Sequence, residues 1–99
     1  MADSAKELLI LFSCKGSITA KKIATEVIAK ELASSVRILN GVNSFFRWVG
    51  KVENAEEQLL LIRTNSEVYA ELEQSIKRLH HHELPEISVV PISIGFPDA

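Results

Sequence analysis

The apolar positions of the chain form four short runs separated by polar stretches. Residues 8–12 are continuously apolar, which is typical of a central strand that is covered on both faces. Residues 36–39 and 59–62 are further runs of this kind, and 87–94 is rich in β-branched residues. An acidic stretch at 54–57 is expected to interrupt the chain before the third strand. The pattern predicts strands at 8–12, 36–48, 58–64 and 87–94.

Two other stretches carry apolar residues at helical spacing. The first is expected to begin at Ser17, whose hydroxyl can accept from the free amides of the next turn, and to end near residues 33–35. The second is expected to be capped by Asn65 or Ser66 and to stop before Pro85, which cannot continue a helix. Their apolar faces would contain Ala20, Ile23, Ala24, Val27, Ile28 and Leu32, and Val68, Leu72, Ile76 and Leu79.

Between the second and third strands the sequence predicts a long hairpin. Phe46 and Trp48 lie near its tip, and Gly50 can turn the chain without a Cβ clash. Asn40-Gly41 predicts a bulge within the second strand. One small domain cannot cover such a ribbon, so we expect it to lie on another copy of the chain.

The order strand, helix, strand, strand, helix, strand predicts an α+β fold, a split βαβ or ferredoxin-like sandwich. Its four-stranded antiparallel sheet would have the order 4-1-3-2, with both helices on one face. Pro91 cannot donate to a ladder, which marks the last strand as an edge. The other sheet face would expose apolar side chains, and this predicts an obligate oligomer.

Composition narrows the class of protein. The 99 residues predict one domain, residues 1–99, with its core at about 8–94. A net charge of -2 and a pI of about 5.9 argue against a nucleic-acid partner. A single cysteine forms no internal disulfide, and neither a bilayer-length apolar run nor a secretory leader is present in the sequence. We therefore expect a cytoplasmic protein with no membrane partner.

Several motifs together resemble the CutA divalent-cation-tolerance family. They are Ser44-x-Phe46-x-Trp48-x-Gly50-Lys51, then Glu57, then Leu60-Leu61-Ile62-Arg63-Thr64, and His80-x-x-Glu83-x-Pro85-Glu86-Ile87. The resemblance implies a ferredoxin-like homotrimer in the cytoplasm, in which long hairpins wrap neighbouring subunits. It also implies a link to tolerance of copper and other divalent metals, without an agreed enzymatic reaction. A copper-binding member of the family has a cysteine where this chain has Phe12, and Cys14 follows two residues later.

The candidate metal ligands are His80, His82, Glu86 and Cys14, with copper or zinc as the candidate ion. Imidazole suits both metals, and the resemblance supports His80 with Glu86. Neighbouring side chains on a helix diverge by about 100°, so one ion cannot take three consecutive histidines from a regular helix. The alternatives are solvated histidines at a helix C-terminus and a cysteine that serves as a small buried apolar residue.

The candidate interface residues lie on the hairpin and the third strand. Trp48 and Phe46 are candidate anchors, because aromatic side chains dominate subunit contacts. The charged candidates are Lys51, Glu57 and Arg63, which would form ion pairs that fix register or line a ligand cleft between subunits. A PII-like signalling or scaffold trimer that binds a small ligand or a partner protein is the alternative function. No nucleophile–base constellation or phosphate loop appears in the sequence, and we expect no enzymatic activity.

Overall fold

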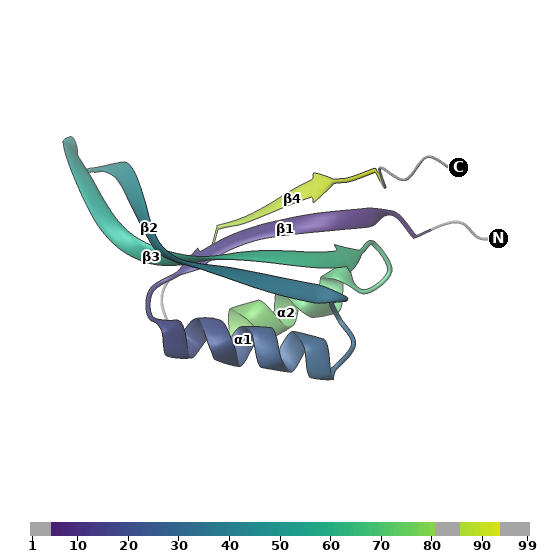
Figure 1. Ribbon diagram of the computed structural model, residues 1–99. Coiled ribbons are helices and arrows are strands. Elements are labelled where there is room, and N and C mark those ends of the chain that lie inside the picture. Colours follow the sequence, from purple (N-terminus) through teal and green to yellow (C-terminus); the bar gives the residue numbers. More distant parts are fainter. Residues whose placement is uncertain (1–4, 81–85, 94–99) are drawn as a thin grey trace.

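The computed structural model describes residues 5–80 and 86–93, which form a four-stranded sheet covered by two helices on one face (Figure 1). The elements are β1 (Glu7–Cys14), α1 (Ser17–Ala29), β2 (Ser35–Trp48), β3 (Lys51–Asn65), α2 (Tyr69–Leu79) and β4 (Ile87–Pro91). All pairings are antiparallel, and the strand order is β2-β3-β1-β4. This is the α+β, ferredoxin-like topology that the sequence predicted. Neither helix is long and apolar enough to cross a membrane within the described part of the chain.

The core lies between the sheet and the helices and follows the alternation of β1. Every second residue of this strand is buried, ending with Phe12 and Cys14. The central residues of the core are Leu8, Ile10, Phe12, Cys14, Leu60 and Ile62 from the sheet, with Ala20, Ile23, Val27, Leu32, Leu72 and Ile76 above them. Burying a leucine or isoleucine side chain contributes about 1.5–3 kcal/mol each, which accounts for most of the stabilisation of this small body.

The first helix begins at Ser17 as predicted, but it is capped differently and ends earlier. Gly16, at a φ of 88°, is the N-cap, and Ser17 is already helical without a side-chain cap, so the Ser17 cap was wrong. At the other end Glu31 has a φ of 60°, and its amide donates to Ile28 O at 3.0 Å. The amide of Leu32 donates to Val27 O at 2.8 Å. These two bonds are a Schellman motif, which ends α1 before residues 33–35.

The second helix begins later than expected. Asn65 and Ser66 close the preceding turn instead of capping α2: Asn65 Oδ1 accepts from the amide of Glu67 at 2.8 Å. Ser66 Oγ accepts from the amide of Lys6 at 2.9 Å. Their side chains are thus used three and four residues before Tyr69, where the helix starts.

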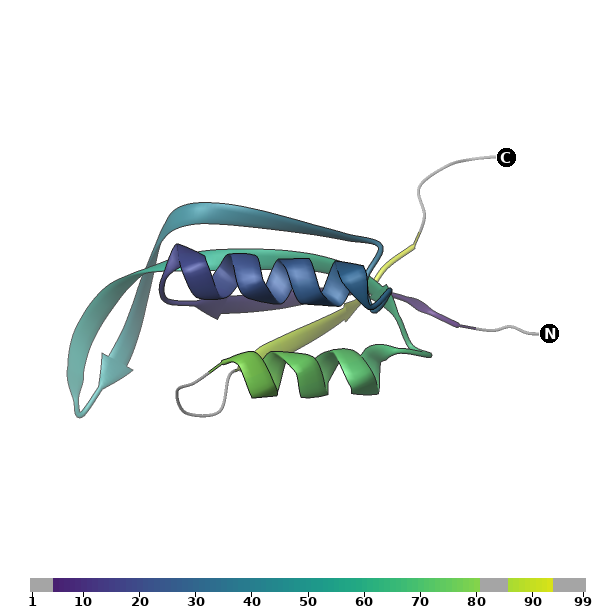
Figure 2. The ribbon, with the colours of Figure 1, turned by 90° about the horizontal axis from the view of Figure 1, so that it is seen from below.

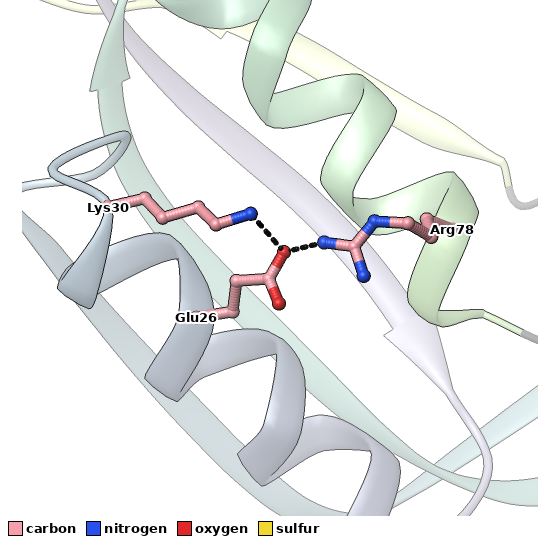
Figure 3. A network of polar contacts seen from close by, with 3 residues as sticks. All are labelled: Glu26, Lys30 and Arg78. Carbon is pink, nitrogen blue, oxygen red and sulfur yellow. Dashed lines mark hydrogen bonds and ion pairs between the residues drawn. The ribbon is translucent and has the colours of Figure 1, made fainter.

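Glu26 joins the two helices (Figure 3). Its Oε2 accepts from Lys30 Nζ at 3.1 Å within α1, as the i,i+4 spacing predicts, and also from the Arg78 guanidinium of α2. The hydrogen bond from Lys30 is the main reason why the pKa of Glu26 is lowered, with Arg78 adding to it. One half-buried carboxylate therefore links α1 to α2.

The predicted long β2-β3 hairpin is present and is more regular than expected. Pairing continues to Trp48 opposite Lys51, and Val49 and Gly50 form the turn with φ values of 51° and 76°. Two positive φ values are the signature of a type I′ turn, which matches the twist of the strands. The interruption at 54–57 was wrong, because these residues remain paired with β2 where no packed body demands apolar side chains.

We call the outer half of this hairpin, residues 42–57, the arm. Figures 1 and 2 show it reaching past the ends of both helices, which makes the molecule 49 Å long but only 27 by 21 Å across. The arm begins at the predicted bulge: Leu39 pairs with Leu59 but Val42 pairs with Glu57. One extra residue is therefore inserted into β2, and Gly41 takes a φ of 71° there.

The sheet face away from the helices is called the open face. Its apolar residues are Leu9, Leu11, Leu39, Leu59, Leu61 and Val90, all partly or largely exposed. β4 forms one edge of the sheet, as Pro91 predicted, and pairs with β1. The open face is more apolar than an antiparallel sheet in contact with water needs to be.

Candidate functional site

Cys14 and His80 lie at the same end of the helix-covered face. The ring of His80, directly after α2, contacts the ring of Phe12 edge to face with a centroid distance of 5.4 Å. Cys14 follows Phe12 by two residues on the same side of β1, because the strand stays regular. The fold therefore brings a thiol and an imidazole into one neighbourhood from elements more than 60 residues apart.

Glu86 reaches the same region from β4. It precedes Ile87, which pairs with Phe12 and packs against the core, whereas Glu86 itself is exposed. His82 lies outside the described residues. Across 5–80 and 86–93, no three histidine, cysteine or acidic side chains are close enough together to hold one metal ion. Cys14, His80 and Glu86 thus share one end of the sheet without forming a coordination sphere within the described part of one chain.

The thiol of Cys14 is kept protonated by its surroundings. Its side chain is buried, and desolvation raises its pKa, with the Glu57 carboxylate adding to the effect. A metal must then displace the proton before the sulfur can bind, which lowers the affinity at neutral pH. At neutral pH Cys14 therefore behaves as a buried apolar residue unless a soft metal reaches it.

The interface candidates on the arm are exposed in the single chain. Trp48 is 60% exposed and pairs with Lys51, and Phe46 is 43% exposed and pairs with Glu53. Other apolar side chains on this hairpin are also exposed, namely Phe45, Val49 and Val52. Both faces of the arm thus offer apolar side chains to a neighbour.

Glu57 and Arg63 lie further down the hairpin. Glu57 Oε1 accepts from Ser44 Oγ at 2.8 Å, a contact that fastens the base of the arm. Arg63 lies on the open face beside Leu9, and its guanidinium is 3.5 Å from a Glu7 carboxylate oxygen. Its buried Nε makes no hydrogen bond within the described residues. The five interface candidates are therefore spread from the tip of the arm to the open face.

The helical layer holds a feature that the sequence analysis missed. An open groove of about 660 Å³ runs along α1 and reaches the end of α2. Ile18, Lys21, Lys22, Thr25, Glu26, Ala29, Lys30 and Leu79 line it. The signal was present in the sequence: the first turn of α1 contains no acidic residue, although the helix dipole favours one there.

Comparison with known proteins finds similarity to CutA proteins in sequence and in structure. The family model described as CutA1 divalent ion tolerance protein matches residues 8–98. The Divalent-cation tolerance protein CutA of Thermus thermophilus is 34% identical over 90% of this chain and 86% of its own. The structure of CutA from Xylella fastidiosa has a TM-score of 0.86 at 34% identity, covering 93% of this chain and 88% of that one. CutA1 from Oryza sativa has a TM-score of 0.87 at 28% identity, covering 94% and 85%.

Other curated relatives are longer. The chain spans about half the length of Protein CutA from Mus musculus and of the chloroplastic Protein CutA from Arabidopsis thaliana, at 48% and 54% of those proteins. The matched parts are 86% and 96% of this chain.

Proposed function

Because the chain belongs to the CutA1 divalent ion tolerance protein family, we propose that it acts as a homotrimer that binds divalent metal ions, copper or zinc, at low affinity. The family and its relatives are named for tolerance and not for a reaction, which favours a binding role over an enzymatic one. The assembly and the metal are separate parts of the proposal and have separate tests.

The proposed assembly is supported by the apolar side chains of the open face. Leucines from three strands, among them Leu11 and Leu61, stand directly opposite one another on a face that no helix covers. Removing apolar surface from water is worth about 25 cal/mol per Å², so covering a patch of standard interface size outweighs the cost of association. A second copy of the chain has matching apolar surface in its arm.

A ring explains the shape of the arm. The arm and the open face are different surfaces, so an arm that lies on the neighbour's body makes a head-to-tail contact. Such contacts must close into a ring or continue as a filament. We propose three subunits, as the family resemblance implies, with Trp48 and Phe46 as anchors and Lys51, Glu57 and Arg63 as the polar contacts.

Sedimentation equilibrium at low micromolar concentration tests the assembly. We expect a mass of three chains for the wild type and a loss of the trimer in Leu61→Glu, which buries a charge in the interface. Ile18→Glu introduces the same charge on the helix side, where the side chain is 72% exposed, and should leave the mass unchanged. A wild-type chain that sediments as a stable monomer would end this part of the proposal.

The metal part is supported by the shared position of Cys14, His80 and Glu86 at one end of the sheet. Thiolate, imidazole and carboxylate form a mixed set that suits copper or zinc, and neighbouring copies can complete it together with His82. Calorimetry with copper and zinc should show His80→Ala and Cys14→Ser binding about tenfold more weakly than the wild type. Binding that is the same in all three proteins would assign the metal to another place.

The compartment is also part of the proposal. Relatives are named chloroplastic in Arabidopsis thaliana and periplasmic in Archaeoglobus fulgidus, so the family occupies several compartments. For this chain we propose the cytoplasm, where a free thiol such as Cys14 stays reduced.

A further inference from the structure

The groove on the helical layer combines an apolar lining with an excess of positive charge. Its apolar residues are Ile18, Ala29 and Leu79, and three lysines line it against a single carboxylate, that of Glu26. Ile18 is 72% exposed although it lies in the first turn of a regular helix. A single exposed isoleucine needs no explanation, but one that joins two other apolar residues in a groove marks a contact surface.

The charge of this groove is not neutralised by the chain itself. Glu26 already accepts from both Lys30 and Arg78, so its charge is offset. Within residues 5–80 and 86–93 no carboxylate forms an ion pair with Lys21 or Lys22. Because the whole chain carries a net charge of -2, this surface is a local positive region on an acidic protein.

We propose that the groove docks an acidic amphipathic segment of a partner protein. Leucine-sized side chains of the segment pack against Ile18, Ala29 and Leu79, while its carboxylates pair with Lys21 and Lys22. The length of the groove favours a segment over a compact ligand, since Ile18 and Ala29 are eleven residues apart and thus about 16 Å along the helix. An apolar stripe flanked by charge is the mode in which grooves take amphipathic helices.

This docking does not depend on the proposed trimer. The residues that line the groove are exposed or half-buried residues of α1 and α2. Figure 2 shows these two helices covering one face of the sheet, which is the face opposite the open face. An assembly through the open face and the arm would leave the groove accessible on every subunit. A monomer would bind the same segment with the same site, so failure of the trimer and failure of the docking are distinguishable.

Fluorescence anisotropy with a labelled probe peptide tests the proposal. The probe has about 15 residues, with leucines at i, i+3, i+4 and i+7 and glutamates at most other positions. We expect saturable binding that weakens as salt is raised, because attraction to exposed lysines is screened. The same peptide with lysines in place of the glutamates should not bind. Absence of saturable binding by the acidic probe overturns the proposal.

Two matched pairs of variants locate the site. Lys22→Glu should weaken the Kd about tenfold, whereas Lys6→Glu makes the same charge change outside the groove and should leave it unchanged. Ile18→Ser should also weaken binding, whereas Ile28→Ser, on the same helix but outside the groove, should not. Circular dichroism confirms that each variant is folded.

Two further results would overturn the assignment. Equal losses in Lys22→Glu and Lys6→Glu would mean general electrostatic attraction and no groove. Binding of the chain to vesicles of phosphatidylglycerol, lost in Lys22→Glu while the peptide stays unbound, would assign the surface to an anionic membrane.

Discussion

The imidazole of His80 stands edge-on to the ring of Phe12, at an interplanar angle of 75° and a centroid distance of 5.4 Å. According to the family resemblance of the sequence, a copper-binding relative has a cysteine at the position of Phe12. In this chain an aromatic ring therefore fills the place beside the histidine, and the thiol is two residues further along, at Cys14.

Replacing Phe12 by cysteine is expected to lower the stability of the fold and to raise its affinity for metal. Phe12 is fully buried, so Phe12→Cys should lower the free energy of unfolding by about 3 kcal/mol. The new sulfur would face His80, and added copper or zinc should then raise the Tm of the variant. Phe12→Ala has a similar cavity without the ligand, and thermal melts should show no such gain. An equal gain in both variants would contradict the prediction.

The buried thiol of Cys14 should make stability decline in alkaline solution. Its pKa is raised by desolvation and then by Glu57, so the folded state favours the protonated form. This contribution is complete below the unfolded pKa, about 8.5, and is lost as the pH rises through the folded pKa. Urea titrations from pH 7 to 10 should show the wild type losing stability relative to Cys14→Ala. A difference that stays constant across this range would contradict the assigned shift.

A companion test removes the charge of the Glu57 carboxylate, which acts on Cys14. Glu57→Gln removes the smaller of the two causes that raise the pKa of Cys14. Alkylation of the thiol should therefore become faster at a given alkaline pH. Glu56→Gln changes a neighbouring exposed carboxyl that is not among those causes, and it should leave the alkylation rate near that of the wild type.

The ion pairs of Glu26 should stabilise the packing of the two helices only above acidic pH. The pKa of Glu26 is lowered by the hydrogen bond from Lys30 and by Arg78, so its contribution is present at neutral pH and is lost as the pH falls through the folded pKa. Glu26→Gln should lower the Tm at pH 7 but not at pH 2 or in strong salt. Glu73→Gln removes a pair within α2 alone and should have a smaller effect.

The end of α1 offers a stabilising substitution. Glu31 has a positive φ at the position where helices commonly place glycine, and the left-handed conformation costs a residue with a Cβ about 1 kcal/mol. Glu31→Gly should therefore raise the free energy of unfolding by about that amount in urea titrations. Gln74→Gly, at an exposed site inside α2, should lower it by about 1 kcal/mol. A loss of stability in Glu31→Gly would show that its side chain has another role.

Local patterns predicted the elements well, because the helices have apolar residues at helical spacing and each strand contains an apolar or β-branched run. The strand order, the edge position of Pro91 and the bulge at Asn40-Gly41 followed from the same local rules. Helix ends were predicted poorly, because several polar residues near each end can cap a helix and the packed structure uses different groups. Ser66, for example, accepts from the amide of Lys6, the residue directly before β1 and 60 positions away in the sequence.

The site was less predictable than the fold. The proximity of His80 to Phe12 depends on how α2 packs on β1, and no local pattern carries that information. The same holds for the link from Glu26 to Arg78, which joins residues 52 positions apart. The acidic residues at 54–57 were misread because the expectation of an apolar strand applies to strands over a core, and the arm extends beyond it.

The single extra residue near Gly41 determines to which side of the hairpin each side chain of the arm points. Side chains alternate with a period of two, so an odd insertion exchanges the two sides for the rest of the strand. If the same sequence paired without the bulge, Ser44, Phe46 and Trp48 would move to the side now occupied by Phe45 and Arg47. Deleting Gly41 instead would close the bulge and leave Val42 opposite Glu57, so these side chains would stay on their present side. The extra residue is thus the reason why Phe46 and Trp48, and not Phe45 and Arg47, lie on the side of the arm that continues the open face.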